Sequence, residues 1–100
     1  MYEIKSLETV LNYIEDEKNY FAGFGYVIRQ CHVAREIKTQ LWEDGQIGDN
    51  ESIFISERIE RAYRKAIETH KNWVIRVLSE SKSQHTIETL VSTIYHDIFN

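Results

Sequence analysis

The side chains that could support metal binding or nucleophilic chemistry are few and widely spaced. The cysteine and the histidines of the sequence are Cys31, His32, His70, His85 and His96. Zinc sites need clustered Cys and His side chains, and no Glu-x-x-His pair of the di-iron type occurs. The acidic loop 44–51 lacks the alternating ligands of a calcium loop. We therefore expect no metal ion, no cofactor and no catalytic residue.

His70 lies in the middle of an apolar helical face, where the usual role is a core histidine bonded to a hydroxyl such as that of a tyrosine. The alternative role is a pH switch or a catalytic group. The spacing of Arg64 and His70 is similar to the Arg-x(4–6)-His pattern of the HEPN ribonucleases, which are also all-helical. On one helix, six residues separate the two side chains by about 120° around the axis. Arg64 would then face solvent while His70 faces the core, so we do not extend the ribonuclease function to this chain.

The segment that carries His70 predicts the central element of the fold. Between residues 55 and 78, apolar side chains recur at helical spacing and cover nearly half the circumference, an arc wide enough to contact two or three neighbours. Proline is absent and glycine occurs four times, which disfavours a β fold. The same periodicity predicts helices over 3–19, 26–43, 52–81 and 84–99. Short connections favour a single all-α domain, residues 1–100, that is an antiparallel four-helix bundle (up-down-up-down) with a long central third helix.

The composition indicates the environment of the protein. Cys31 falls on the apolar side of its predicted helix and has no cysteine to pair with, which fits a reducing compartment. No apolar run approaches membrane length, and the first residues lack the apolar core of a secretion signal. We expect a cytoplasmic protein without membrane contact. The 13 isoleucines and four alanines are typical of an AT-rich bacterial or phage genome.

Three tyrosines provide the first candidate binding surface. Tyr2, Tyr13 and Tyr20 fall near one another on the outer side of the first predicted helix. Half-exposed tyrosines are common on helices, and this spacing can arise by chance. Tyrosine is also favoured at protein interfaces. The more specific interpretation is therefore that the three tyrosines form a binding surface for a partner protein or for a second copy of the chain.

A basic strip provides the second candidate surface. Residues 56–76 carry a net charge of +3, whereas the whole chain carries −4. Arg58, Arg61 and Lys65 line one side of the third predicted helix, and such strips contact nucleic-acid phosphates or acidic proteins. The ion pairs that helical spacing predicts, which would neutralise much of this charge, are Glu57–Arg61, Glu60–Arg64 and Glu68–Lys71.

These features favour a small non-enzymatic protein–protein interaction module, a regulator or inhibitor encoded by a phage or another mobile element. Its predicted contacts are the three tyrosines on one surface and the basic strip on another, with a homodimer as one form of association. The alternative is a nucleic-acid-binding dimer that combines two basic strips into one surface.

Overall fold

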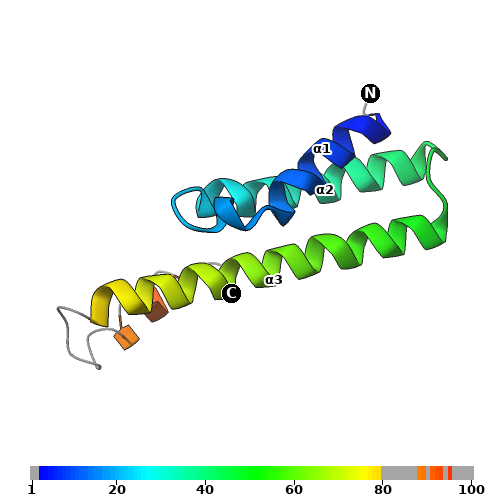
Figure 1. Cartoon of the computed structure of the whole chain (residues 1–100). Coiled ribbons are helices and arrows are strands. Elements are labelled where there is room, and N and C mark those ends of the chain that lie inside the picture. Colours follow the sequence, from blue (N-terminus) through cyan, green and yellow to red (C-terminus); the bar gives the residue numbers. More distant parts are fainter. Residues whose placement is uncertain (1–2, 80–87, 90, 94, 96–100) are drawn as a thin grey trace.

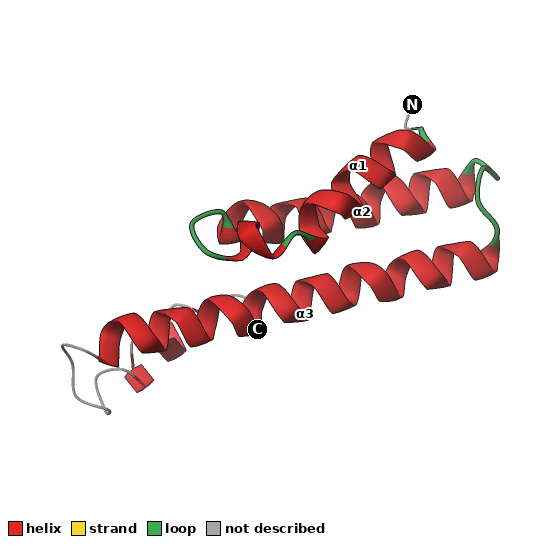
Figure 2. Cartoon of the chain, in the orientation of Figure 1, coloured by secondary structure: helices red, strands yellow, loops and turns green. Residues whose placement is uncertain are grey.

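The computed structural model describes residues 3–79, 88–89, 91–93 and 95. The helices of this part are α1 (Ile4–Glu15), the short 3-10 helix η1 (Glu17–Tyr20), α2 (Phe24–Glu43) and α3 (Asp49–Ser79), as Figure 2 shows. The described residues from 88 to 95 are also helical. The protein is therefore all-α, and its helices pack as a bundle, as the sequence predicts.

The chain reverses direction between α1 and α2 and again between α2 and α3 (Figure 1). α2 packs extensively against both α1 and α3, whereas α1 and α3 meet over a smaller area. The up-down-up-down topology stays a prediction, because the predicted fourth helix, 84–99, lies largely outside the described residues. The central position of the third helix also stays a prediction, since α2 has the larger contacts in the described part.

Buried apolar side chains from every helix form one core. In α1 and α3 they recur every three or four residues, so each helix turns one stripe inward. The fully buried side chains of the core include Leu11, Val27, Cys31, Leu41 and Ile59. Truncating a buried leucine or isoleucine to alanine typically costs about 2–5 kcal/mol. The packing of these stripes therefore holds the bundle together.

α1 ends earlier than the sequence predicts. The prediction of a helix over 3–19 is wrong at its end, because Asp16 adopts an extended conformation with φ −83° and ψ 112°. The Asp16 carboxylate accepts a hydrogen bond from the backbone N–H of Lys18 at 3.1 Å, and this bond starts η1. The chain direction therefore changes before Tyr20, which no longer continues the helical periodicity of α1.

The turn between α2 and α3 is built around a glycine. Gly45 has φ +75°, the left-handed conformation that glycine adopts at little cost. The N–H of Gly45 donates to the carbonyl of Trp42 at 3.1 Å, and the N–H of Gln46 donates to that of Leu41 at 2.9 Å. These two bonds form a Schellman motif. α3 begins at Asp49, three residues before the predicted start.

Candidate functional site

The three tyrosines do not form the exposed surface that the sequence predicts. Tyr20 is only 1% exposed, and its hydroxyl donates to the carbonyl of Ile14 at 2.7 Å. Burial raises the pKa of Tyr20 to about 12. Tyr13 is half-buried and packs edge-to-face on Tyr26, with 5.2 Å between ring centroids. Tyr2 lies outside the described residues. The helix break at Asp16 turns Tyr20 inward, so its placement on an outer surface is wrong.

The basic strip lies against the end of α1 and η1, where two carboxylates pair with it. Arg58 donates from Nε to Glu15 at 3.1 Å and forms a second bond to the same carboxylate through Nη2. This hydrogen bonding raises the pKa of Arg58. Lys65 pairs with Glu17. Arg61 forms no ion pair within the described residues. The three cations therefore lie together on α3, and two of them are already neutralised.

One of the three predicted intrahelical ion pairs forms. Arg64 donates to Glu60 at 2.8 Å, which confirms that pair. Glu60 also accepts from Arg35 of α2 at 3.1 Å, so its carboxylate links the two helices. The other two predictions are wrong, because the ion pairs of residues 3–79 do not include Glu57–Arg61 or Glu68–Lys71.

The strip and the neighbouring helices line an open pocket of about 300 Å³, here called the basic pocket. Its lining residues are Glu15, Tyr20, Arg58, Arg61, Ala62 and Lys65. The cations come from one side of α3, the carboxylate from the last residue of α1, and the tyrosine from the last residue of η1. The early end of α1 creates this pocket, because it brings Glu15 and Tyr20 over the same two turns of α3.

His70 is a core histidine bonded to a tyrosine, as predicted. Its Nδ1 forms a hydrogen bond with the hydroxyl of Tyr95, and its ring stacks on Phe24 with 4.1 Å between centroids and 11° between planes. Burial lowers the pKa of His70, which favours the neutral ring. The Arg64 side chain is 79% exposed and bonds to Glu60. The two groups therefore do not meet at one site.

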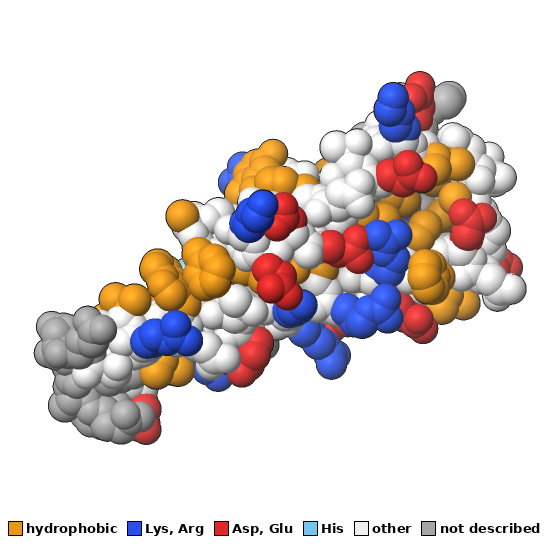
Figure 3. Space-filling model, in the orientation of Figure 1, with side chains coloured by type: hydrophobic (Ala, Val, Ile, Leu, Met, Phe, Trp, Pro, Cys, Tyr) orange, Lys and Arg blue, Asp and Glu red, His pale blue; other side chains and the backbone are white. Residues whose placement is uncertain are grey.

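A cluster of exposed apolar side chains lies at the other end of α3, and two of its members, Trp73 and Val77, belong to the apolar stripe of residues 55–78. Phe21 and Trp73 form an edge-to-face pair with 5.9 Å between ring centroids. They are 39% and 38% exposed, and Val77, one turn beyond Trp73, is 50% exposed. Figure 3 shows hydrophobic side chains gathered over the C-terminal half of α3 and the loop before α2. Phe21, Trp73 and Val77 are called the aromatic surface below.

The position of α2 explains this exposure. Phe24, the first residue of α2, stacks on His70 of α3. The residues of α3 beyond His70 therefore extend past the beginning of α2, and the apolar stripe of α3 continues where α2 no longer covers it. The signal in the sequence was the length of the stripe, which is longer than the 20-residue helix that packs on it.

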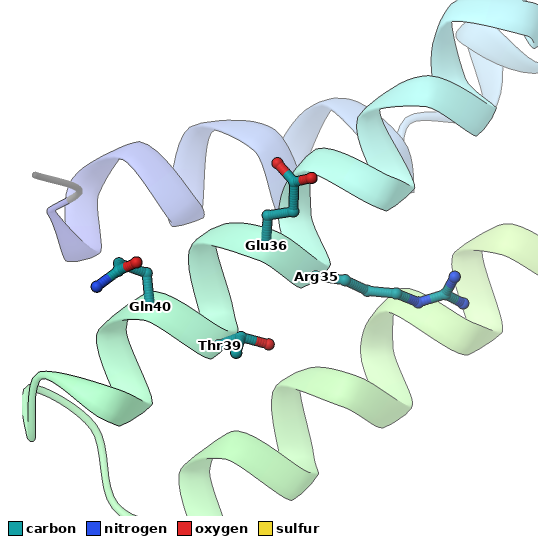
Figure 4. A pocket seen from close by; sticks show the side chains of 4 residues that line it. All are labelled: Arg35, Glu36, Thr39 and Gln40. Carbon is teal, nitrogen blue, oxygen red and sulfur yellow. The ribbon is translucent and has the colours of Figure 1, made fainter.

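Two further surface features are a group of exposed apolar side chains near the turn between α2 and α3 and a depression on α2. Trp42, Ile53 and Phe54 are exposed near the turn between α2 and α3, and the indole N–H of Trp42 donates to the Asp49 carboxylate at 2.7 Å. A depression of about 470 Å³ lies on α2 and is lined by Arg35, Glu36, Thr39 and Gln40. Figure 4 shows that all four side chains come from this one helix and that Arg35 extends toward α3. No side chain there is a nucleophile held next to a base.

Comparisons with known proteins give no family for the chain. No protein-family model matches it, and neither a curated protein nor a solved structure matches it significantly. Within residues 3–79 and the described positions from 88 to 95, no three His, Cys, Asp or Glu side chains are grouped so that they could hold a metal ion. In the same part of the chain, no helix is both long and apolar enough to cross a membrane.

Proposed function

We propose that this protein is a small, non-enzymatic protein-binding module that acts as a regulator or inhibitor in the cytoplasm. The observation that supports the proposal most strongly is the aromatic surface. Tryptophan is among the residue types enriched at the energetic centres of protein interfaces, and phenylalanine is common in their cores. An exposed Phe–Trp pair next to an exposed valine is the kind of apolar patch that a partner covers.

The groups that could do chemistry have structural roles, which supports the non-enzymatic part of the proposal. His70 is stacked on Phe24 and bonded to Tyr95. Cys31 is fully buried, and burial raises the pKa of its thiol to about 11. A thiol with a raised pKa is a poor nucleophile at neutral pH, because the thiolate is the reactive form.

We also propose that residues 84–99 complete an antiparallel four-helix bundle in which α3 is the central helix. Val91 and Tyr95 are 8% and 1% exposed, and the Tyr95 hydroxyl bonds to His70 of α3. The two buried positions are four residues apart, as one stripe of a helix requires. Amide hydrogen exchange tests this arrangement, since a docked fourth helix protects its backbone N–H groups and an undocked one does not.

The binding experiment compares two substitutions on α3. Val77→Lys places a charge on the aromatic surface, and the matched control Ile53→Lys places one at a similarly exposed position (59% against 50%) near the other end of the helix. Light scattering after size exclusion gives the molar mass of each variant. If wild type and Ile53→Lys are dimers and Val77→Lys is a monomer, the partner is a second copy of the chain.

If all three proteins are monomers, each serves as bait for a partner. A protein retained by wild type and Ile53→Lys but not by Val77→Lys supports the proposal. Equal retention by all three baits, or equal dimerisation, contradicts a binding role for this surface. The thermal stability of the two variants is compared first, so that lost binding is not confused with unfolding.

The nucleic-acid-binding dimer is a weaker candidate. Glu15 and Glu17 neutralise two cations of the strip, whereas binding to an extended polyanion rests on many uncompensated positive charges. A mobility shift at low salt that Arg61→Gln reduces would support this candidate, and no shift at low salt would eliminate it.

A further inference from the structure

The basic pocket combines positive charge with a shape that a flat basic strip lacks. Arg58, Arg61 and Lys65 lie three and four residues apart, so their side chains share one side of α3. The buried side chains of Ala62 and Tyr20 contribute to the lining, and Glu15 closes the side formed by α1. The volume of about 300 Å³ matches the lower end of small-molecule pockets, which is about 300–1,000 Å³.

The three cations of the basic pocket differ in how strongly other side chains already bind them. Arg58 is held in place by two bonds to Glu15, through Nε and Nη2. Its guanidinium has five N–H donors, so the Nη1 donors remain for a ligand. Arg61 forms neither an ion pair nor a hydrogen bond within the described residues. Its guanidinium is therefore available to bind an anion that enters the pocket.

Lys65 forms an ion pair with Glu17, and this carboxylate would compete with an anionic ligand for the Lys65 ammonium group. Its pair with Glu17 is exposed, with 59% and 65% of the two side chains accessible to solvent. Exposed ion pairs of this kind contribute little to stability. An anionic ligand can therefore replace Glu17 as the partner of the Lys65 ammonium group at a small cost in free energy. The Arg58–Glu15 pair is more strongly held, because its side chains are only 29% and 36% exposed and two hydrogen bonds join them.

We infer that the basic pocket binds a phosphate monoester, with Arg61 as its main ligand and with Arg58 and Lys65 on either side. A monoester carries nearly two negative charges at neutral pH and presents three oxygen acceptors, which match the planar guanidinium fork. Glu15 and Glu17 keep the net charge of the wall low, which favours one compact anion over a long polyanion. This inference does not rest on the proposed function, because the pocket and the aromatic surface share no residue.

The test uses the ¹⁵N-labelled full chain in phosphate-free buffer, titrated with phenyl phosphate and followed by NMR. We expect saturable shifts of the amide signals of residues 58–65. Arg61→Gln should weaken binding about tenfold or more, since it removes a charged hydrogen-bonding fork. The matched control is Arg76→Gln, which makes the same charge change on an exposed part of α3 and should alter the affinity less than about twofold, because exposed charges so far away are screened.

A second variant tests whether Glu17 competes with the ligand for Lys65. It also separates a loss of the binding site from a loss of folding. Glu17→Gln removes the partner of Lys65 and should tighten binding about two- to fivefold, the gain typical of removing one exposed ion pair. A variant that only damaged the fold could not strengthen binding. Equal effects of Arg61→Gln and Arg76→Gln, or the absence of saturable shifts, would overturn the inference.

The source of the phosphate is distinguished by two further titrations. A short peptide with a phosphotyrosine that binds more tightly than phenyl phosphate assigns the pocket to a phosphorylated partner protein. Equal binding of the two assigns it to a free phosphate ester, and both results support the inference. A single-stranded oligonucleotide that binds more tightly than either monoester overturns it in favour of a nucleic-acid surface.

Discussion

Tyr20→Phe should destabilise the protein although it removes a single oxygen atom. The Tyr20 hydroxyl is buried and donates to the carbonyl of Ile14 at 2.7 Å. Ile14 lies in the last turn of α1, where carbonyl groups have no partner within the helix. A phenylalanine at position 20 would leave this carbonyl unsatisfied in the core. The expected loss is about 1–3 kcal/mol in the free energy of unfolding.

A loss of this size is measurable by thermal unfolding followed by circular dichroism. In a domain of this size, 1 kcal/mol lowers Tm by about 4–8 °C, so we expect a decrease of at least about 4 °C for Tyr20→Phe. The matched control is Tyr26→Phe, which removes the hydroxyl from a tyrosine that is 54% exposed and lies in the first turn of α2. Exposed substitutions of this kind change stability by less than about 0.5 kcal/mol.

If Tyr20→Phe and Tyr26→Phe unfold at the same temperature, the hydroxyl of Tyr20 does not stabilise the end of α1 and the reasoning is wrong. The result also determines how the tyrosines can be tested for binding. Replacing Tyr20 with serine would remove a buried aromatic ring and lower the free energy of unfolding by about 3–5 kcal/mol. The total free energy of unfolding of a typical domain is about 5–15 kcal/mol, so this loss is a large share of it. Substituting all three tyrosines with serine would therefore unfold the protein before it tested an interface.

Three other predictions concern single positions. Burial lowers the pKa of His70, so the unfolded chain binds more protons near pH 6 than the folded chain does. The free energy of unfolding should therefore fall as pH drops from 7.5 to 5. Urea unfolding should show a smaller fall for His70→Phe than for wild type, and equal falls would contradict this role of His70. Gly45→Ala should cost about 1–2 kcal/mol because φ is +75°, whereas Gly48→Ala, with open space around the added carbon, should be nearly neutral in the same assay. Cys31 should react with a thiol reagent only as fast as the chain opens, since it is fully buried with a pKa of about 11; rapid labelling of the folded protein would refute its burial.

The periodic stripes gave correct predictions wherever one helix runs without interruption. The all-α class, the approximate bounds of α2 and α3 and the Glu60–Arg64 pair follow from spacing along one element. The hydrogen bond between His70 and a tyrosine was also correct in kind, because a polar ring on an apolar face needs a partner. Which tyrosine supplies the hydroxyl depends on how distant segments pack, and the periodicity of one segment cannot show it.

The two surface predictions depended on geometry between elements. Tyr13 and Tyr20 share a face only if the helix continues past residue 15, and the extended backbone at Asp16 removes that condition. Trp73 and Val77 share the apolar stripe of α3 with Ile59, but α2 begins beside His70 and does not cover them. A stripe identifies which residues can be buried, whereas the length and position of the neighbouring helix decide which of them are. The part of a stripe that extends past its neighbour is therefore a better guide to exposed apolar surface than a group of tyrosines on an outer face.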